Sequence, residues 1–197
     1  MGSVKRNLIM SDFLRKHIEN IVRLSDEEYE EILGFFQFRK YRKRQFLIQE
    51  NQMVDELFIV KSGLLKCGMI DNSGKEQILQ FATEDWWISD YTAFYKHQPA
   101  RLAVDCIEDS EVYSITFEHM NEVCRKIPKA EHFFRVKSNL GYCALQDRVL
   151  ALMTKTAKER YEDFIHQYSE WGSRIPKQLI ASYLGVSRET LSRLYSS

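Results

Sequence analysis

The chain has 197 residues, of which 44% are hydrophobic and 28% are charged, so it can bury a core and form one or two domains. Its 28 basic and 28 acidic residues cancel to a formal net charge of zero at pH 7. These values exclude a chain that is disordered over most of its length and a polycationic nucleic-acid binder. Any contact with nucleic acid must therefore come from a local basic patch.

Membrane and secretory signals are missing from the sequence. No apolar run approaches the roughly 18–20 residues of a membrane span. The first ten residues, MGSVKRNLIM, lack the apolar stretch of a secretory signal. We therefore expect a cytoplasmic protein that makes no contact with a membrane.

The cysteines and histidines are too scattered for a disulfide scaffold or a metal site. No CxxC, HxH or HExxH pattern occurs among the four cysteines and five histidines. We expect no metal, no iron–sulfur cluster and no other cofactor. The cysteines are interpreted as small buried residues, and they are Cys67, Cys106, Cys124 and Cys143.

The first 38 or so residues have a helical pattern, which then gives way to short strands. Ser25 and Glu28 have the spacing of a capping box at a helix start. From about Arg39 the pattern alternates, and short β-branched and aromatic runs are separated by turn residues. The runs are 45–49, 56–61, 64–70, 77–82, 102–107 and 111–115. Six or more such strands predict a barrel, jelly roll or sandwich.

After Thr116 the pattern is helical again. A short helix is expected over 117–125 and a long one over 130–153, followed by a third over 156–168 and a break at 172–173. The long segment is apolar on two faces, so it needs two partners: one can be the β domain, and the other is a second copy of the same helix. The residues placed near that two-fold seam are Phe133, Val136, Leu140 and Cys143.

The last 24 residues carry the strongest functional signal. Pro176 suits a helix start, Gly185 suits the left-handed residue that ends a helix, and Ser187 suits the cap of the next helix. Two helices joined by Gly-Val-Ser are typical of a helix-turn-helix. Their apolar residues would fill the angle between the helices.

The outer face of the second helix has the chemistry for reading DNA. It carries Arg188, Glu189, Ser192 and Arg193. Arginine can bind guanine through two hydrogen bonds, and glutamate can accept one from cytosine. Lys177 and Arg174 are expected to hold phosphates, the latter near a wing. Segment 172–197 has a net charge of +3, from Arg174, Lys177, Arg188 and Arg193 against Glu189.

Over residues 24–195 the chain resembles the Crp/Fnr family of bacterial transcription regulators. Segment 180–193, IASYLGVSRETLSR, is similar to the family's DNA-reading signature. Segment 57–63, LFIVKSG, followed by a charged hairpin at 71–75, is similar to its cyclic-nucleotide-binding β-roll. The resemblance implies a homodimer that reads a palindrome with TGA-like half-sites. It also implies base contacts by Arg188, Glu189 and Arg193.

The β-roll departs from the family members that bind cyclic AMP. Those members place Gly-Glu and Arg-Ser around the nucleotide, whereas this chain has Ser89-Asp90 and Ala100-Arg101. Arg101 is displaced by one position, which on a strand points to the opposite face. We therefore expect an effector other than cyclic AMP, or none. The oxygen-sensing members hold a cluster through N-terminal cysteines, and this chain has none before Cys67.

Two further segments have two interpretations each. For Trp86 and Trp87, one ring in the core and one partly exposed is the simpler interpretation, and rings lining a ligand are the alternative. The basic run at 39–44 is either a solvated strand edge or a contact to flanking DNA or to RNA polymerase.

These observations lead to one expected fold and function. The fold class is α+β, with a jelly-roll or double-stranded β-helix sensor domain over 1–128, a dimerisation helix over 129–153 and a winged helix-turn-helix over 154–197. The chain would be a homodimeric, sequence-specific transcription regulator without enzymatic activity, which binds double-stranded DNA through the recognition helix 188–195 and also contacts RNA polymerase. The alternatives are a ligand-binding signalling module with a vestigial DNA-binding domain, and a cupin-like metalloenzyme, which the histidine spacing disfavours.

Overall fold

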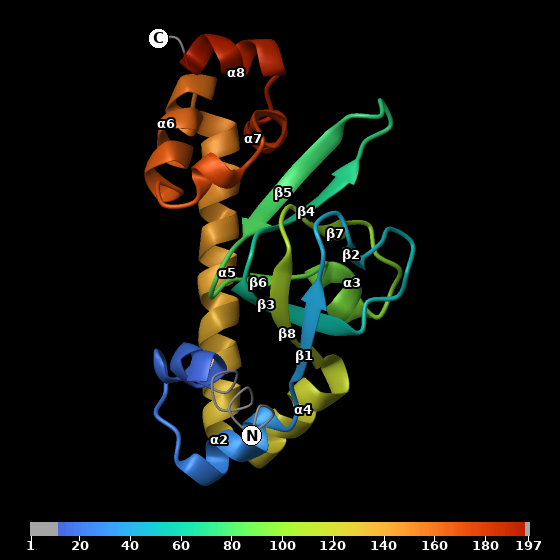
Figure 1. The fold of residues 1–197 in the computed structure, drawn as a ribbon, viewed down its shortest axis with the longest axis vertical. Helices are drawn as coiled ribbons and strands as arrows, with labels where there is room; N and C mark the ends of the chain where they lie inside the picture. Colours follow the sequence, from blue (N-terminus) through green and yellow to red (C-terminus); the bar gives the residue numbers. More distant parts are fainter. Residues whose placement is uncertain (1–11, 196–197) are drawn as a thin grey trace.

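Eight short strands form a roll of two four-stranded antiparallel sheets in the computed structural model, which describes residues 12–195 (Figure 1). The strand orders are β1-β8-β3-β6 and β2-β7-β4-β5. The strands are β1 (Gln37–Tyr41), β2 (Phe46–Ile48), β3 (Glu56–Ser62), β4 (Leu65–Ile70), β5 (Glu76–Ala82), β6 (Trp87–Ile88), β7 (Ala103–Cys106) and β8 (Ser110–Thr116). Residues 1–11, which include the MGSVKRNLIM segment, and residues 196–197 lie outside the described residues.

Helices lie at both ends of the roll, and α5 runs past its whole length (Figure 1). They comprise a helix over 12–19, α2 (Asp26–Leu33), α3 (Tyr91–Lys96), α4 (Phe117–Lys126), α5 (Pro128–Thr154), α6 (Ala157–Gln167), a 3₁₀ turn (Gly172–Arg174), α7 (Lys177–Leu184) and α8 (Arg188–Tyr195). Within residues 12–195, none of the helices combines the length and the apolar character that crossing a bilayer requires.

All six predicted strands and the predicted helices after Thr116 are present, each within a few residues of its expected bounds. The capping box at Ser25 and Glu28 is confirmed, with both reciprocal hydrogen bonds formed. Three elements were not predicted: β1, β6 and α3. β1 lies partly in the segment expected to be helical, and its pairing with β8 stabilises the extended form.

The wing was expected and is not found: no strand follows β8 in the described part of the chain. Residues 172–174, which include the Arg174 expected near the wing, form a 3₁₀ turn. The cysteine expectation also needs a correction. Cys67 and Cys106 are buried and Cys124 is half-buried, but Cys143 is exposed on α5.

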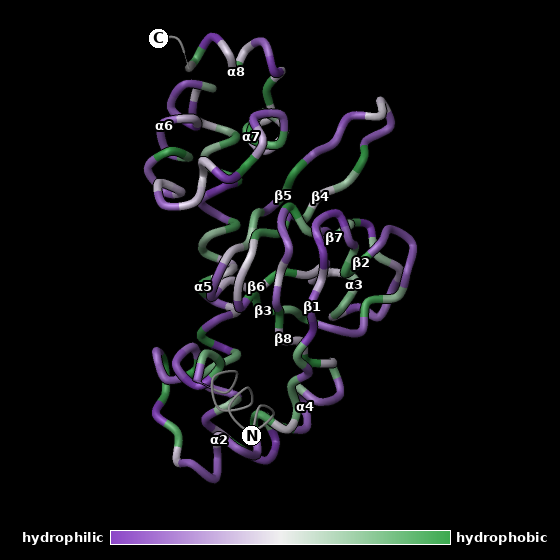
Figure 2. Tube along the Cα trace, in the orientation of Figure 1, coloured by the Kyte–Doolittle hydropathy of each residue, from purple (hydrophilic) through white to green (hydrophobic). Residues whose placement is uncertain are grey.

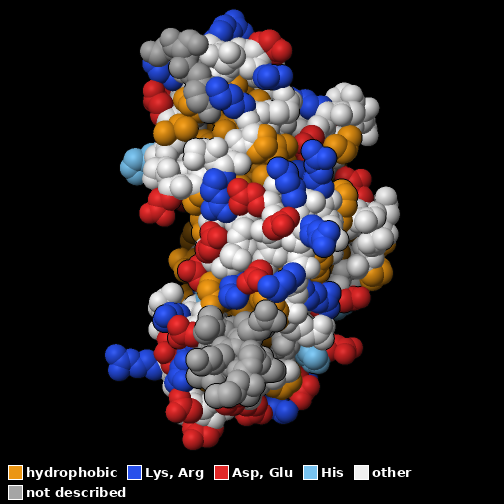
Figure 3. Space-filling view, viewed as in Figure 1, with side chains coloured by type: hydrophobic (Ala, Val, Ile, Leu, Met, Phe, Trp, Pro, Cys, Tyr) orange, Lys and Arg blue, Asp and Glu red, His pale blue; other side chains and the backbone are white. Residues whose placement is uncertain are grey.

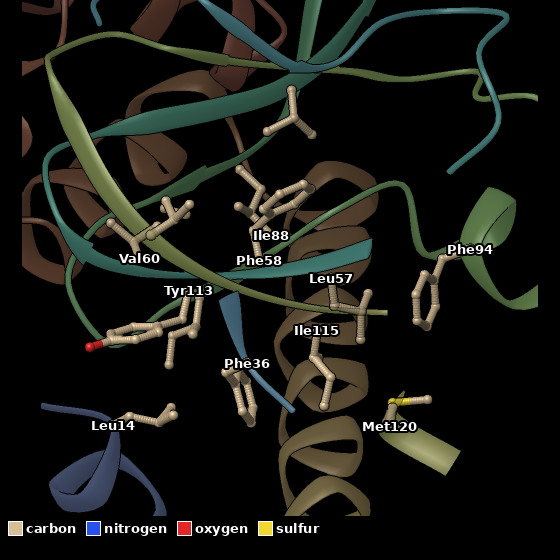
Figure 4. Packing of buried hydrophobic residues seen from close by; sticks show 14 of the residues in the cluster. Leu14, Phe36, Leu57, Phe58, Val60, Ile88, Phe94, Tyr113, Ile115 and Met120 are labelled. Atoms are coloured by element: carbon tan, nitrogen blue, oxygen red, sulfur yellow. The ribbon is translucent and has the colours of Figure 1, made fainter. Parts of the chain in front are cut away.

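The main core fills the roll and extends to the helices beneath it. Figure 4 shows Leu57, Phe58, Val60, Ile88 and Ile115 of the roll together with side chains from the surrounding helices, including Leu14 and Met120. Burial of such side chains is worth about 1.5–3 kcal/mol each.

A second core joins the roll to the C-terminal helices. Phe81 of β5 lies against Phe164 of α6 and Tyr183 of α7, with ring centroids 6.4 and 5.3 Å apart. Figure 2 shows apolar segments of β5 and α7 where the two meet. The roll contributes Leu64, Ile78, Phe81 and Ile107, and the C-terminal part contributes Phe164, Tyr168, Trp171, Ile175, Ile180, Ala181, Leu184 and Leu191.

The long helix α5 has a buried start and an uncovered middle. Phe133 is 1% exposed and packs edge-on to His17, so its expected place at a two-fold seam is wrong. By contrast, every residue from 138 to 147 is exposed, including Leu140, Tyr142 and Leu145. In the single chain this stretch is exposed to solvent, and at its start Ser138 forms a side-chain hydrogen bond with Tyr95 of α3.

Candidate nucleic-acid interface

The turn between α7 and α8 is built by local backbone chemistry. Gly185 has a φ of +69°, which glycine adopts without the strain of a side chain, and its N–H donates to carbonyl groups of the last turn of α7. Ser187 then accepts a hydrogen bond on its Oγ from the N–H of Thr190 at 3.1 Å. A glycine stop followed by a serine cap fixes the start of α8.

The two faces of α8 have opposite character. Leu191 is buried against Ile180, Ala181 and Leu184 of α7. On the other face, four exposed residues line one shallow surface depression, and they are Arg188, Glu189, Ser192 and Arg193. Figure 3 shows Lys and Arg side chains gathered at this end of the molecule. The four residues singled out in the sequence thus lie together on one accessible helix face.

Glu189 belongs to the charged set on α8. Hydrogen bonds from its own backbone N–H and from Ser187 lower the pKa of its carboxyl group. The carboxylate is therefore an acceptor at neutral pH, between the positive charges of Arg188 and Arg193. The surface offers donors and an acceptor together, which is the chemistry that base edges in a major groove require.

The two candidate phosphate contacts lie in different surroundings. Lys177 is exposed at the start of α7. Arg174 instead faces the roll: its guanidinium pairs with Glu108 at 2.5 Å and approaches Glu84 at 3.8 Å. The hydrogen bond that Arg174 donates to Glu108 raises the pKa of Arg174. To bind a phosphate, Arg174 would have to leave these two carboxylates. In this respect it differs from the four exposed residues of α8.

Two arginines that the sequence analysis passed over hold the helix pair in place. Arg148 of α5 donates from Nη2 to the carbonyl groups of Ile78 on β5 and Tyr183 on α7, both at 2.8 Å, and stacks 3.6 Å above the Tyr183 ring. Arg160 of α6 donates to the carbonyl of Leu184 at the end of α7. In the sequence, the feature that could have pointed to Arg148 is a charged residue within an apolar face of the predicted long helix.

The positions where a cyclic nucleotide would be expected are occupied by internal hydrogen bonds. Asp90 is 2% exposed, and its carboxylate accepts from the backbone N–H groups of Ala93 at 3.0 Å, Arg101 at 2.8 Å and Leu102 at 3.0 Å. Ser89 donates to the carbonyl of Glu56 at 3.1 Å. The chain's own carboxylate thus takes the backbone donors that an anionic ligand would need. In residues 12–195 no three His, Cys, Asp or Glu side chains cluster as a metal site would require.

The basic run at 39–44 divides into two parts. On β1, Arg39 pairs with Glu56 at 2.7 Å and Lys40 pairs with Glu111. The side chains of Arg42, Lys43 and Arg44 are exposed in the turn that follows. Arg39 and Lys40 therefore fit the interpretation as a strand edge. For residues 42–44, a contact to flanking DNA or to RNA polymerase stays an open interpretation.

Comparison with known proteins finds a family match for the roll and relatives that cover most of the chain. Residues 38–127 match the cyclic nucleotide-binding domain family. The chain is 27% identical over 185 residues to the regulatory protein HlyX of Actinobacillus pleuropneumoniae, with 87% of this chain and 75% of HlyX covered. It is also 27% identical over 184 residues to the fumarate and nitrate reduction regulatory protein of Escherichia coli, with 87% and 72% covered.

Over most of its length the chain is similar to regulators of the Crp/Fnr type. The fold agrees with this similarity. FixK2 from Bradyrhizobium japonicum superposes with a TM-score of 0.72 at 20% identity, covering 82% of this chain and 83% of FixK2. The chain therefore has the mixed α/β fold of these Crp/Fnr-type structures, and its roll matches a cyclic nucleotide-binding domain.

Proposed function

We propose that this protein is a homodimeric, sequence-specific transcription regulator of the cytoplasm that reads a palindromic operator with α8 and has no enzymatic activity. The observation that carries the proposal is the polar face of α8, where Arg188, Glu189, Ser192 and Arg193 lie together, opposite the buried Leu191. The relatives named above are regulators, which supports the same conclusion.

Each side chain has a proposed role. Arg188 and Arg193 read guanines through paired hydrogen bonds, Glu189 reads a cytosine or adenine amino group, and Ser192 contacts a neighbouring base edge or phosphate. Lys177 at the start of α7 holds a phosphate. Arg174 does so only if DNA displaces its partner Glu108.

The uncovered middle of α5 supports a homodimer. Leu140 and Tyr142 are 58% and 69% exposed in the single chain, which is unusual for large apolar side chains in the centre of a long helix. A second α5 packed along the face that carries Leu140 and Cys143 would cover Leu140, whereas Tyr142 lies on the other side of the helix. Two recognition helices would then meet successive major grooves about 34 Å apart.

The roll serves as a sensor of a molecule other than cyclic AMP, or as a scaffold. The hydrogen bonds of Asp90 support this, because they occupy backbone donors that a phosphate would use. The exposed turn at 42–44 is a proposed contact to RNA polymerase or to flanking DNA.

Mapping of bound DNA across a bacterial genome that encodes the protein, followed by titration of the recovered sequence by fluorescence anisotropy, tests the proposal. We expect a palindrome that binds much more tightly than a scrambled duplex, and loss of this preference in Arg188→Ala. Equal affinity for both duplexes would favour the alternative, a signalling module with a vestigial DNA-binding domain.

A further inference from the structure

Residues 84–87 contact two different parts of the molecule in alternation. The side chains of Glu84 and Trp86 reach the C-terminal helices, whereas those of Asp85 and Trp87 reach the helix over 12–19. Residues 84 and 85 form a turn, closed by a hydrogen bond from the N–H of Trp86 to the carbonyl of Thr83, and this turn directs successive side chains to different parts of the molecule. Both tryptophans are half-buried, so the expected partly exposed ring is found but the expected fully buried core ring is not.

The contact with the N-terminal helix is made through His17, whose ring is buried. Trp87 donates from Nε1 to Nε2 of His17 at 3.0 Å, and Asp85 lies 3.1 Å from Nδ1. An indole N–H can only donate, so Nε2 is the acceptor and Nδ1 carries the proton donated to Asp85. His17 is therefore neutral and held in one orientation. Phe133 of α5 packs against the same ring, at 5.5 Å.

The contact with the C-terminal helices is aromatic, with one ion pair. The Trp86 ring lies 6.1 Å from Tyr168 and 6.0 Å from Trp171, the latter edge-on. Glu84 faces Arg174 at 3.8 Å. Tyr168 and Trp171 belong to the second core, which also holds Leu191 of α8.

The backbone between these contacts is fixed. Asp85 has a φ of +69°, uncommon for a residue other than glycine. Its N–H donates to the carbonyl of Val60, and the N–H of Val60 donates to the carbonyl of Trp86, both at 3.0 Å. Glu84 accepts a hydrogen bond from the N–H of Gly63. Because these hydrogen bonds hold the backbone, we expect a displacement at one contact of the segment to be transmitted to the other contact.

We propose that residues 84–87 couple the helix over 12–19 to the C-terminal helices, so that the position of His17 affects the orientation in which α8 is presented to DNA. Glu84 and Trp86 are positioning residues in this scheme, since they act through the second core rather than on DNA. The consequence for DNA binding rests on the proposed function, whereas the coupling between the two parts of the chain does not.

The first test follows the coupling without DNA. The chain has three tryptophans, and all of them belong to or contact the segment. In protein labelled with 5-fluorotryptophan, each ring gives one ¹⁹F resonance, assigned by single Trp→Phe substitutions. We expect His17→Ala to shift the resonance of Trp171, which does not contact His17. The control Ile32→Ala, which removes a buried side chain from α2 at the opposite end of the molecule from α8, should leave it in place (Figure 1). A Trp171 resonance unmoved by His17→Ala would overturn the proposal.

The second test measures operator affinity in a double-mutant cycle. We expect His17→Ala to weaken operator binding by about 2- to 30-fold, the range that coupling through packed networks spans. In a Trp86→Leu background the same substitution should have no further effect, because the path is already broken. Additive effects of the two substitutions would overturn the coupling while the proposed function stands. A wild-type chain that binds no DNA would overturn the proposed function, and the ¹⁹F result would still decide the coupling.

Discussion

His17 should make the stability of the fold depend on pH in the acidic range. Burial is the main cause that lowers the pKa of His17 from 6.5 to about 4, with a further contribution from the charge of Lys137 and an opposing one from Asp85. A histidine whose pKa is lower in the folded state binds a proton more weakly there than in the unfolded chain. Its contribution to stability is therefore complete above about pH 6.5 and is lost as the pH falls towards 4.

The magnitude follows from the two pKa values. Their difference, at about 1.36 kcal/mol per pH unit, means that protonation of His17 lowers the free energy of unfolding by about 3 kcal/mol between pH 7 and pH 4. That is a large part of the roughly 5–15 kcal/mol of a typical domain. Protonation would also leave the indole N–H of Trp87 without its acceptor.

Urea unfolding followed by tryptophan fluorescence at pH 7, 6, 5 and 4 measures this effect. Carboxylates titrate in the same range, so the comparison is between variants. His17→Gln should be less stable than wild type at pH 7, and the gap should close as the pH falls. His166→Gln, which replaces an exposed histidine on α6, should keep the wild-type profile. A constant gap between wild type and His17→Gln from pH 7 to pH 4 would show that His17 is not held neutral by its surroundings.

Three further outcomes are expected. Arg188→Ala should reduce the free energy of operator binding by roughly 1–3 kcal/mol and relax the base preference at one position, whereas Lys177→Ala should weaken binding to all sequences equally and reduce the slope of log affinity against log salt concentration by about 1. Anisotropy titrations at several salt concentrations separate the two effects. An unchanged operator preference in Arg188→Ala would contradict the role of α8. Leu140→Lys should shift the mass measured by light scattering from that of a dimer towards that of a monomer. The chain should stay folded, because Leu140 is 58% exposed in the single chain. A monomeric wild type would refute a dimer interface along α5. Calorimetry should detect no micromolar binding of cyclic AMP or cyclic GMP, because the Asp90 carboxylate already accepts hydrogen bonds from the backbone N–H groups of Arg101 and Leu102. Micromolar binding of either nucleotide would contradict this and would make Arg101 the leading candidate for a phosphate ligand.

Local patterns were sufficient wherever the chain's own neighbours stabilise an element. The capping box at Ser25, the glycine stop at Gly185 and the cap at Ser187 each depend on residues within a few positions, and all three form as predicted. The polar face of α8 follows from the helical period alone. The two-residue strand β6 is too short to leave a pattern, and its pairing partner β3 lies about 30 residues earlier in the chain.

The sequence by itself determined the order of strands and helices, the capped turn before α8 and the side chains that α8 presents, because these depend on contacts a few residues apart. The tertiary structure alone decided which charges are engaged and which apolar faces are covered. The pairing of Arg174 with Glu108, 66 positions away, is one such charge contact. Phe133 looked like a seam residue until His17 was found against its ring. Such pairings join distant segments, and no period or spacing in the sequence records them.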